Sequence, residues 1–252
     1  NLLPGLHRGA TVNIMSRWDA QKAWQVMEEL GVTYLAANPT LLREVLEISR
    51  VQGRPPAHLR LGISGGGPVP PDLKLAWRDE LKLPLVESYG QSELGGFVGL
   101  GYPALIQDEK ALAVGPALPD KEVKIFDERG QEAPNGQMGE IVIRGGFMVG
   151  YWNKPEKTAE TLRGGWLHSG DIGRMDDAGY VYIVDRVKDM INVAGFKVWP
   201  AEVEQYLYKL PGVQEVAVYG LPHPDKGEQV VAAVVPRPGH ALGAEDVLAY
   251  CR

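Results

Sequence analysis

Short apolar runs alternate with amphipathic segments over residues 20–90, and this alternation limits the possible folds more than any other feature of the chain. Three segments carry apolar residues at helical spacing, namely 20–30, 39–50 and 70–82. Three short apolar runs have the length of buried strands, namely 32–38, 59–64 and 83–90. Strands separated by helices favour a mostly parallel sheet covered by helices.

Beyond residue 110 the pattern changes to paired strands. Alternating stretches around glycine turns predict antiparallel hairpins at 122–145 and 174–186, with one short helix at 154–162. A hairpin around Gly195 and a helix from Pro200 follow. We therefore expect a fold of the α/β and α+β classes in three parts. These are part of a helix-covered, mostly parallel sheet (1–110), a small antiparallel β-barrel-like subdomain (111–185) and a small α+β C-terminal domain (186–252).

The two ends of the chain have unusual patterns for a complete protein. The N-terminal run NLLPGLHRGA has no Met and no signal-peptide layout, and the C-terminal run EDVLAYCR stops inside a pattern typical of an amphipathic helix. We interpret the chain as a piece of a longer protein, with its first and last parts incomplete.

Composition excludes several classes of function. The net charge is −6 and Lys and Arg form no run, so nucleic acid is a poor partner. The one cysteine, Cys251, permits no intrachain disulfide, which fits a cytoplasmic protein. No apolar stretch is long enough to span a membrane. The histidines show no zinc-binding spacing, and no serine lies in a G-x-S-x-G frame.

Three glycines, Gly65, Gly66 and Gly67, lie between a predicted strand and a predicted helix. Consecutive glycines let a ligand approach the backbone, and a helix N-terminus attracts anions. A tight turn between the strand and the helix would need the same residues, so both interpretations stand with equal weight.

The segment ESYGQSELGG (87–96) follows the end of a predicted strand, where ligands bind in open α/β sheets. Tyr89 could cover a purine, Ser92 could bind a phosphate, and Glu93 could hold Mg²⁺. A polar surface turn is the alternative for this segment alone.

Two further segments carry charged candidates. Asp171, at the end of GGWLHSGD (164–171), could accept hydrogen bonds from the hydroxyls of a ribose, or it could serve as a turn residue. Arg186 and Lys188 belong to a dense charged cluster at 185–189, which is unusual for a passive spacer but could also be a solvated hinge.

Five blocks in order resemble one family: GISGGGPVP, ESYGQSE, GEIVIRGGFMVGYWNKPEKT, WLHSGD and DRVKDMINVAGFKVWPAEVE. The resemblance, from about Asn38 to the end, is to the adenylate-forming superfamily of acyl-CoA synthetases, peptide-synthetase adenylation domains and firefly luciferase. The last block is most similar to bacterial medium- and long-chain fatty acyl-CoA synthetases.

The resemblance implies roles for the residues of the first two blocks. It assigns Gly65, Gly66 and Gly67 to the adenine pocket. It places the ring of Tyr89 on the adenine, with Gly90 in the same nucleotide site. Ser92 would contact the α-phosphate, at a position where the family more often has threonine. Glu93 would coordinate Mg²⁺.

The later blocks carry the remaining implied roles. Asp171 would bind the ribose hydroxyls with help from Arg186. Lys188 would be the hinge about which a mobile C-terminal domain moves between two half-reactions. Gly195 would lie on the loop that closes over the pantetheine arm of CoA.

The implied reaction is that of an AMP-forming acid–thiol ligase, which uses ATP, Mg²⁺ and CoA. A carboxylic acid, expected to be a fatty acid, reacts with ATP to give an acyl-adenylate and pyrophosphate. The thiol of CoA then takes the acyl group and releases AMP. Aryl, amino or short-chain acids are alternative substrates, and a non-catalytic nucleotide-binding protein is an alternative of another class. Peripheral membrane contact and homo-oligomerisation stay open.

Two family elements have no counterpart in these 252 residues. The Ser/Thr/Gly-rich phosphate loop would precede Asn1, and the lysine of a P-x-T-x-x-G-K-like motif would follow Arg252. We therefore expect this chain alone to be catalytically inactive and a longer parent protein to be the ligase.

Overall fold

The computed structural model describes residues 2–67, 69–101 and 109–251. Pro68 of the GISGGGPVP block and the terminal Arg252 therefore lie outside the described residues. The chain divides into two compact units, Asn1–Leu118 and Pro119–Arg252. The predicted part boundaries at 110/111 and 185/186 stay predictions.

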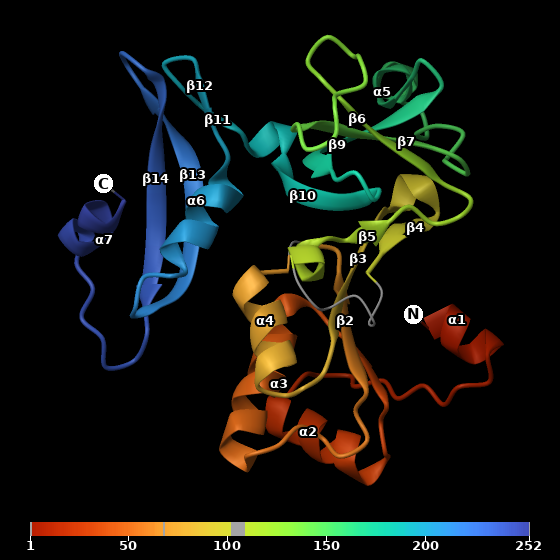
Figure 1. The fold of residues 1–252 in the computed structure, drawn as a ribbon, viewed down its shortest axis with the longest axis vertical. Helices are drawn as coiled ribbons and strands as arrows, with labels where there is room; N and C mark the ends of the chain where they lie inside the picture. The colour runs from red at the N-terminus through yellow and green to blue at the C-terminus, as the bar shows by residue number, and fades with distance from the viewer. Residues whose placement is uncertain (1, 68, 102–108, 252) are drawn as a thin grey trace. The chain divides into compact units, whose positions relative to one another are not determined.

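The first unit contains a four-stranded sheet in the order β1-β2-β3-β4 (Figure 1). Its strands are β1 (Tyr34–Ala36), β2 (Leu61–Gly65), β3 (Leu85–Gln91) and β4 (Gly96–Leu100). The pairs β1–β2 and β2–β3 are parallel, whereas β4 runs antiparallel to β3. The predicted, mostly parallel sheet is thus confirmed, with β4 as an addition that the sequence pattern did not reveal.

Three helices accompany this sheet: α2 (Ala20–Glu29), α3 (Pro39–Gln52) and α4 (Pro71–Asp79). Asp19 caps α2 by accepting a hydrogen bond from the Lys22 amide, and Asn38 caps α3 by accepting one from the Leu41 amide. Gly53 ends α3 in the left-handed conformation, with φ of 70°. The shorter elements of the unit are α1 (Leu2–His7), the 3₁₀ turns η1 (Ser92–Leu94) and η3 (Glu109–Leu112), and β5 (Gly115–Pro116).

The core of the first unit lies between the helices and the sheet. Its fully buried members are large and apolar, and they include Leu42, Leu46, Leu73 and Trp77. A Cβ added at Gly62 on β2 would lie 2.7 Å from the ring of Trp77, so α4 packs directly on the strand. This close packing fixes the helix that follows the glycine run.

A buried ion pair also fastens α4 to the sheet. Lys74 of α4 is 3% exposed and Glu87 of β3 is 6% exposed, and the Lys74 ammonium contacts one oxygen of the Glu87 carboxylate. The other oxygen accepts a hydrogen bond from the Val69 amide at 3.2 Å. Glu87 thus joins β3, α4 and the segment just after the glycine run.

The second unit begins with a curled antiparallel half-barrel. Its strands β6 (Glu122–Phe126), β7 (Gly139–Arg144), β9 (Trp166–Met175) and β10 (Tyr180–Arg186) follow the order β10-β9-β7-β6. The short strand β8 (Leu162–Arg163) pairs with β9 after helix α5 (Pro155–Thr161). Ile141, Ile143 and Leu167 are fully buried between these strands. The predicted β-barrel-like subdomain is confirmed as a fold class.

The unit continues into a smaller α+β part. Its elements are η4 (Val187–Asp189), β11 (Ile191–Val193), β12 (Phe196–Val198), α6 (Pro200–Leu207), β13 (Val213–His223), β14 (Gly227–Pro236) and α7 (Ala244–Tyr250). The four strands form a sheet in the order β12-β11-β14-β13. Its core includes Ile191, Leu207 and Val216. The predicted α+β class of this part is confirmed.

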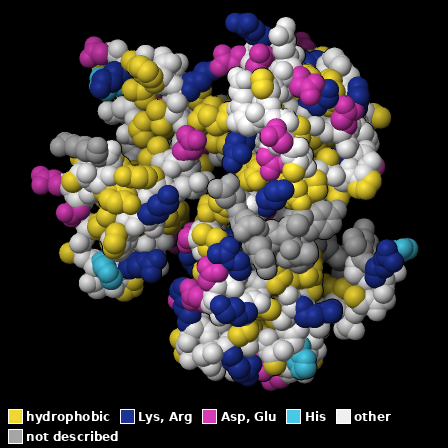
Figure 2. Space-filling model, in the orientation of Figure 1, with side chains coloured by type: hydrophobic (Ala, Val, Ile, Leu, Met, Phe, Trp, Pro, Cys, Tyr) yellow, Lys and Arg dark blue, Asp and Glu magenta, His cyan; other side chains and the backbone are white. Residues whose placement is uncertain are grey.

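Basic, acidic and hydrophobic side chains intermingle on the face shown in Figure 2. Within the described residues, no helix has the length and apolar character that crossing a bilayer requires.

We predict that Lys74→Met lowers the free energy of unfolding by about 3–5 kcal/mol, because it leaves the buried Glu87 carboxylate without its counter-ion. The double variant Lys74→Met/Glu87→Gln should recover much of this loss, since the glutamine is neutral and can still accept from Val69. Urea unfolding measures both effects. The control is Lys22→Met on the exposed side of α2. Equal stabilities of Lys74→Met and Lys22→Met would contradict the prediction.

Candidate functional site

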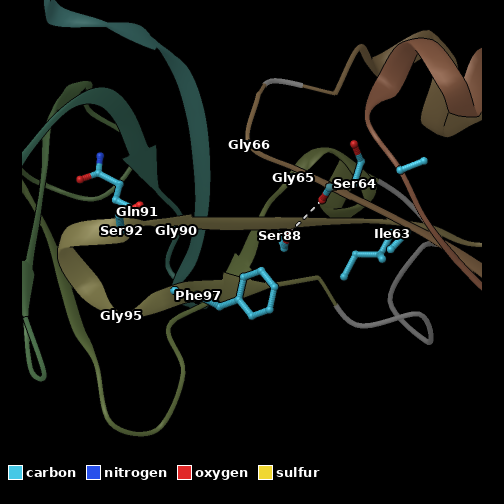
Figure 3. A pocket seen from close by; sticks show the side chains of 13 residues that line it. Ile63, Ser64, Gly65, Gly66, Ser88, Gly90, Gln91, Ser92, Gly95 and Phe97 are labelled. Atoms are coloured by element: carbon cyan, nitrogen blue, oxygen red, sulfur yellow. Dashed lines mark hydrogen bonds between the residues drawn. The ribbon is translucent and has the colours of Figure 1, made fainter. Parts of the chain in front are cut away.

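A cavity of about 660 Å³ lies in the first unit where the strands β1, β2 and β3 end (Figure 3). Its lining comes from segments that end or follow these strands: Ala36, Ala37, Ile63, Ser64, Gly65, Gly66, Ser88, Gly90, Gln91, Ser92, Gly95, Gly96 and Phe97. The carboxyl ends of parallel strands meet at one sheet edge, which explains why residues far apart in sequence share the cavity. None of these lining residues is charged.

Four residues predicted from the sequence meet at this cavity, namely Gly65, Gly66, Gly90 and Ser92. Gly67, Tyr89 and Glu93 were predicted for the same site but are not among its lining residues. Tyr89 is 7% exposed, and strand alternation turns its ring to the face of β3 opposite the Ser88 side chain. Glu93 is half-buried on η1. The roles of all seven residues stay predictions.

The three consecutive glycines differ in whether the structure around them requires a glycine. A Cβ at Gly65 would lie 2.3 Å from Ser88 Oγ, so close packing demands glycine there. Gly66 has φ of 82°, a conformation that favours glycine. Around a Cβ at Gly67, no described atom lies within 4 Å. The tight-turn interpretation therefore explains Gly65 and Gly66, whereas no described atom around Gly67 requires a glycine there.

Two serine hydroxyls, those of Ser64 and Ser88, lie near the ends of β2 and β3. Ser88 Oγ donates to the Ser64 carbonyl at 3.0 Å. Ser64 itself is 2% exposed, and its hydroxyl has no hydrogen-bond partner among the residues that the structure describes. A buried hydroxyl without a partner is unfavourable, so a ligand that reached Ser64 would gain a hydrogen bond. Sequence reasoning missed Ser64 and Ser88, although both lie at predicted strand ends.

In the second unit the structure brings Asp171 and Arg186 together. The two residues are register partners on β9 and β10, and Arg186 Nε lies 3.2 Å from Asp171 Oδ1. Asp171 is buried, whereas the Arg186 side chain is 56% exposed. A carboxylate held beside an exposed guanidinium suits the binding of a ligand that carries both hydroxyl and phosphate groups.

The charged cluster that follows has two kinds of members. Lys188 is exposed on η4, at the predicted hinge. Asp185 is structural, because its carboxylate accepts from the amides of Arg186 and Ala201 and so caps the first turn of α6. Burial raises the pKa of Glu204 on α6; the Val218 amide opposes this rise and nearby Asp185 adds to it.

Gly195 occupies the turn between β11 and β12, as predicted. It is exposed, its φ is 90°, and its amide donates to Asn192 Oδ1 at 2.9 Å. The glycine is therefore required by the turn itself, and its contact with CoA stays a prediction.

The described part of the chain contains no metal site built from protein side chains alone. No three or more His, Cys, Asp or Glu side chains gather there in a way that could hold an ion. Mg²⁺ commonly takes one or two carboxylates and completes its shell with phosphates and water. A single carboxylate such as Glu93, near the cavity, therefore fits Mg²⁺ that arrives with a nucleotide.

Comparison with known proteins shows the family to which the chain belongs. The model of the AMP-binding enzyme family matches residues 1–152, and the model of the AMP-binding enzyme C-terminal domain matches residues 202–252. The chain belongs to the AMP-binding enzymes. The predicted membership of the adenylate-forming superfamily is thus confirmed.

The relatives in this family are named for different carboxylic acid substrates. The chain is 38% identical over 251 residues to a feruloyl-CoA synthase of Amycolatopsis, covering 99% of this chain and 51% of that protein. It is 38% identical over 214 residues to a long-chain-fatty-acid–CoA ligase of Escherichia coli, covering 84% of this chain and 38% of that protein. The chain thus spans about half or less of the length of these relatives.

A solved structure supports the same assignment. The o-succinylbenzoate CoA synthetase of Bacillus subtilis, in complex with ATP and a magnesium ion, superposes with a TM-score of 0.86 at 30% identity. The match covers 100% of this chain and 51% of that one. The chain therefore shares its fold with an enzyme whose solved structure contains ATP and a magnesium ion.

We predict that Gly65→Ala destabilises the chain by about 1–3 kcal/mol, because the new methyl group would overlap the Ser88 hydroxyl. Gly67→Ala is the matched control, with open space around the new atom. It should change the free energy of unfolding by less than about 0.5 kcal/mol. Urea unfolding of both variants tests this, and similar losses in both would show that Gly67 is also packed.

Proposed function

We propose that this chain is part of an AMP-forming ligase that activates a carboxylic acid with ATP and transfers the acyl group to CoA. The observation that carries the proposal is the cavity at the strand ends, where Gly65, Gly66, Gly90 and Ser92 meet in a chain of the AMP-binding family. Open parallel sheets bind their ligands at this edge.

In the first half-reaction, a carboxylate oxygen of the acid attacks the α-phosphorus of ATP, and pyrophosphate leaves. In the second, the sulfur of CoA attacks the acyl carbon, the thiol loses its proton, and AMP leaves. The protein contributes mainly position and charge compensation. We assign Ser92 to the α-phosphate and Glu93 to Mg²⁺, which would neutralise phosphate charge when bound.

Asp171 and Arg186 are assigned to the ribose in this proposal, as a carboxylate that accepts from hydroxyls and a cation beside it. Lys188 and Gly195 are assigned to the movement of the C-terminal part and to the CoA arm. Both are exposed, which such roles require.

The lining of the cavity favours an apolar, uncharged acid. Ala36, Ala37, Ile63 and Phe97 contribute apolar surface, and the other lining residues are glycine or neutral polar residues. Among the described lining residues, no carboxylate could pair with the ammonium of an amino acid, and no cation could pair with a second carboxylate. We propose a fatty acid as the substrate.

An aryl acid is the second candidate. The chain is as similar to the feruloyl-CoA synthase as to the fatty acid ligase, at 38% identity each. Phe97 offers a ring on which an aromatic acid could stack.

The phosphate loop and the P-x-T-x-x-G-K-like motif do not occur in these 252 residues. We propose that the adenylation step needs those segments of a longer cytoplasmic protein, while the residues of this chain bind the nucleotide. Loss of one electrostatic contact typically costs about 10²–10³ in rate, so turnover by this chain alone should be close to the background.

We predict that Asp171→Asn weakens AMP binding at least about tenfold, because the amide is a poorer acceptor for ribose hydroxyls than the carboxylate. Isothermal titration with AMP measures the change. Asp225→Asn, an exposed residue between β13 and β14, is the control and should bind AMP like the unchanged chain. If both variants bound AMP with equal affinity, Asp171 would have no role in binding the ribose.

We further predict acid-dependent exchange of labelled pyrophosphate into ATP by a longer protein that contains this chain, and none by this chain alone. Fatty acids should support the fastest exchange. Faster exchange with aryl acids would establish the second candidate instead. If the longer protein bound AMP but exchanged pyrophosphate with no fatty, aryl, amino or short-chain acid, the protein would be a nucleotide-binding protein without ligase activity.

A further inference from the structure

The carboxylate of Glu140, which has no role in the reaction proposed above, collects three donors in the second unit. Glu140 lies near the start of β7. His168 Nδ1 lies 2.7 Å from Oε2, the Gly170 amide donates to Oε1 at 3.2 Å, and Arg163 Nη2 lies 3.4 Å from Oε2. Since a carboxylate can only accept, the Nδ1 atom of His168 carries the shared proton.

These contacts surround a bulge in β9. Glu140 pairs with Ile172 and Val142 pairs with His168, so three residues, 169–171, lie opposite the single residue Ile141. Gly170 has φ of 73°, which lets the strand turn outward at this point. Asp171 is the last residue of the bulge, and its own register partner is Arg186 on β10.

The bulge is held from both of its ends. Ser169 Oγ donates to the Ile141 carbonyl at 2.6 Å and accepts from the Asp171 amide at 3.0 Å. Glu140 binds His168 before the bulge and Gly170 inside it. The His168 side chain is 9% exposed, so the interaction is shielded from water and stronger than a surface pair.

We propose that Glu140 is a positioning residue for the nucleotide: it holds the bulge 169–171 in the shape that presents Asp171 to the ribose hydroxyls. The inference rests on the role of Asp171 in the proposed function. Glu140 acts through His168 and Gly170, and it contacts neither Asp171 nor Arg186 by any of its hydrogen bonds. Its effect on binding should therefore depend on the presence of ribose hydroxyls in the ligand.

The test compares AMP with 2′,3′-dideoxy-AMP by isothermal titration. Glu140→Gln keeps the size of the side chain but can accept through one atom only, so the bulge loses part of its support. We expect Glu140→Gln to bind AMP about tenfold more weakly and dideoxy-AMP within about twofold of the unchanged chain. In the variant Glu140→Gln/Asp171→Asn, AMP binding should be no weaker than in Asp171→Asn alone.

Arg163→Ala is the matched control, because Arg163 is the exposed and most distant of the three partners of Glu140. It should bind both nucleotides like the unchanged chain. Hydrogen exchange of the Gly170 amide gives a readout without any ligand, and it should become faster in Glu140→Gln but not in Arg163→Ala.

The outcomes separate the inference from the proposed function. If Asp171→Asn loses AMP affinity and Glu140→Gln does not, Glu140 has no positioning role, even where Gly170 exchanges faster. An equal loss for AMP and dideoxy-AMP in Glu140→Gln would also overturn the inference, since it would indicate general destabilisation. If the unchanged chain binds AMP no better than dideoxy-AMP, the ribose role of Asp171 fails, and the inference fails with it.

Discussion

The geometry of the cavity in the first unit depends on how the buried carboxylate of Glu87 is satisfied. A charge at 6% exposure is very unfavourable without partners, so β3 can adopt its place only where Lys74 of α4 and the Val69 amide also reach Glu87. The same contacts fix the segment after Gly67, because Val69 lies two residues beyond it. The formation of β3, the packing of α4 and the conformation of the glycine turn therefore depend on one another.

In the second unit, too, a glutamate on a strand supports an irregular segment of the backbone. There the carboxylate of Glu140 joins β7 to the bulge of β9, as Glu87 joins β3 to the segment after the glycines. In both cases an acidic side chain on a strand accepts from a backbone amide of a neighbouring irregular segment. Irregular segments need such support because their amides have no regular strand or helix partner. The bulge of β9 carries the binding candidate Asp171, and Val69 lies two residues beyond the binding candidate Gly67.

Much of this fold could be predicted from the sequence, because local signals such as caps and turns determine where elements begin and end. Asn38 before Pro39 and Gly53 after α3 delimit that helix, and the glycine turn at Gly195 gives its hairpin. Strand β1 is shorter than the apolar run 32–38, because the Val32 amide is used to close α2 and Asn38 is used to cap α3. Strand β4 was missed, since its five residues, GFVGL, include two glycines, which weaken a strand pattern.

The site was predictable only where residues lie at strand ends. Gly65, Gly90 and Ser92 follow from that rule and line the cavity. Tyr89 does not line it, because alternation along β3 turns adjacent side chains to opposite faces, and its role stays a prediction. Phe97 enters the cavity from the unpredicted β4. Glu140 could not be recognised at all, since its partner His168 is 28 residues away and only the pairing of β7 with β9 brings the two together.

The distribution of charge between the two groups of candidates also bears on function. The described residues that line the cavity of the first unit carry no charge, while Asp171 and Arg186 provide opposite charges side by side. A neutral, partly apolar cavity suits a flat base or an apolar acid, and a charged pair suits a hydroxylated, phosphorylated sugar. An acyl-adenylate combines all of these groups in one molecule. The two units thus offer two different binding chemistries, each described by its own residues.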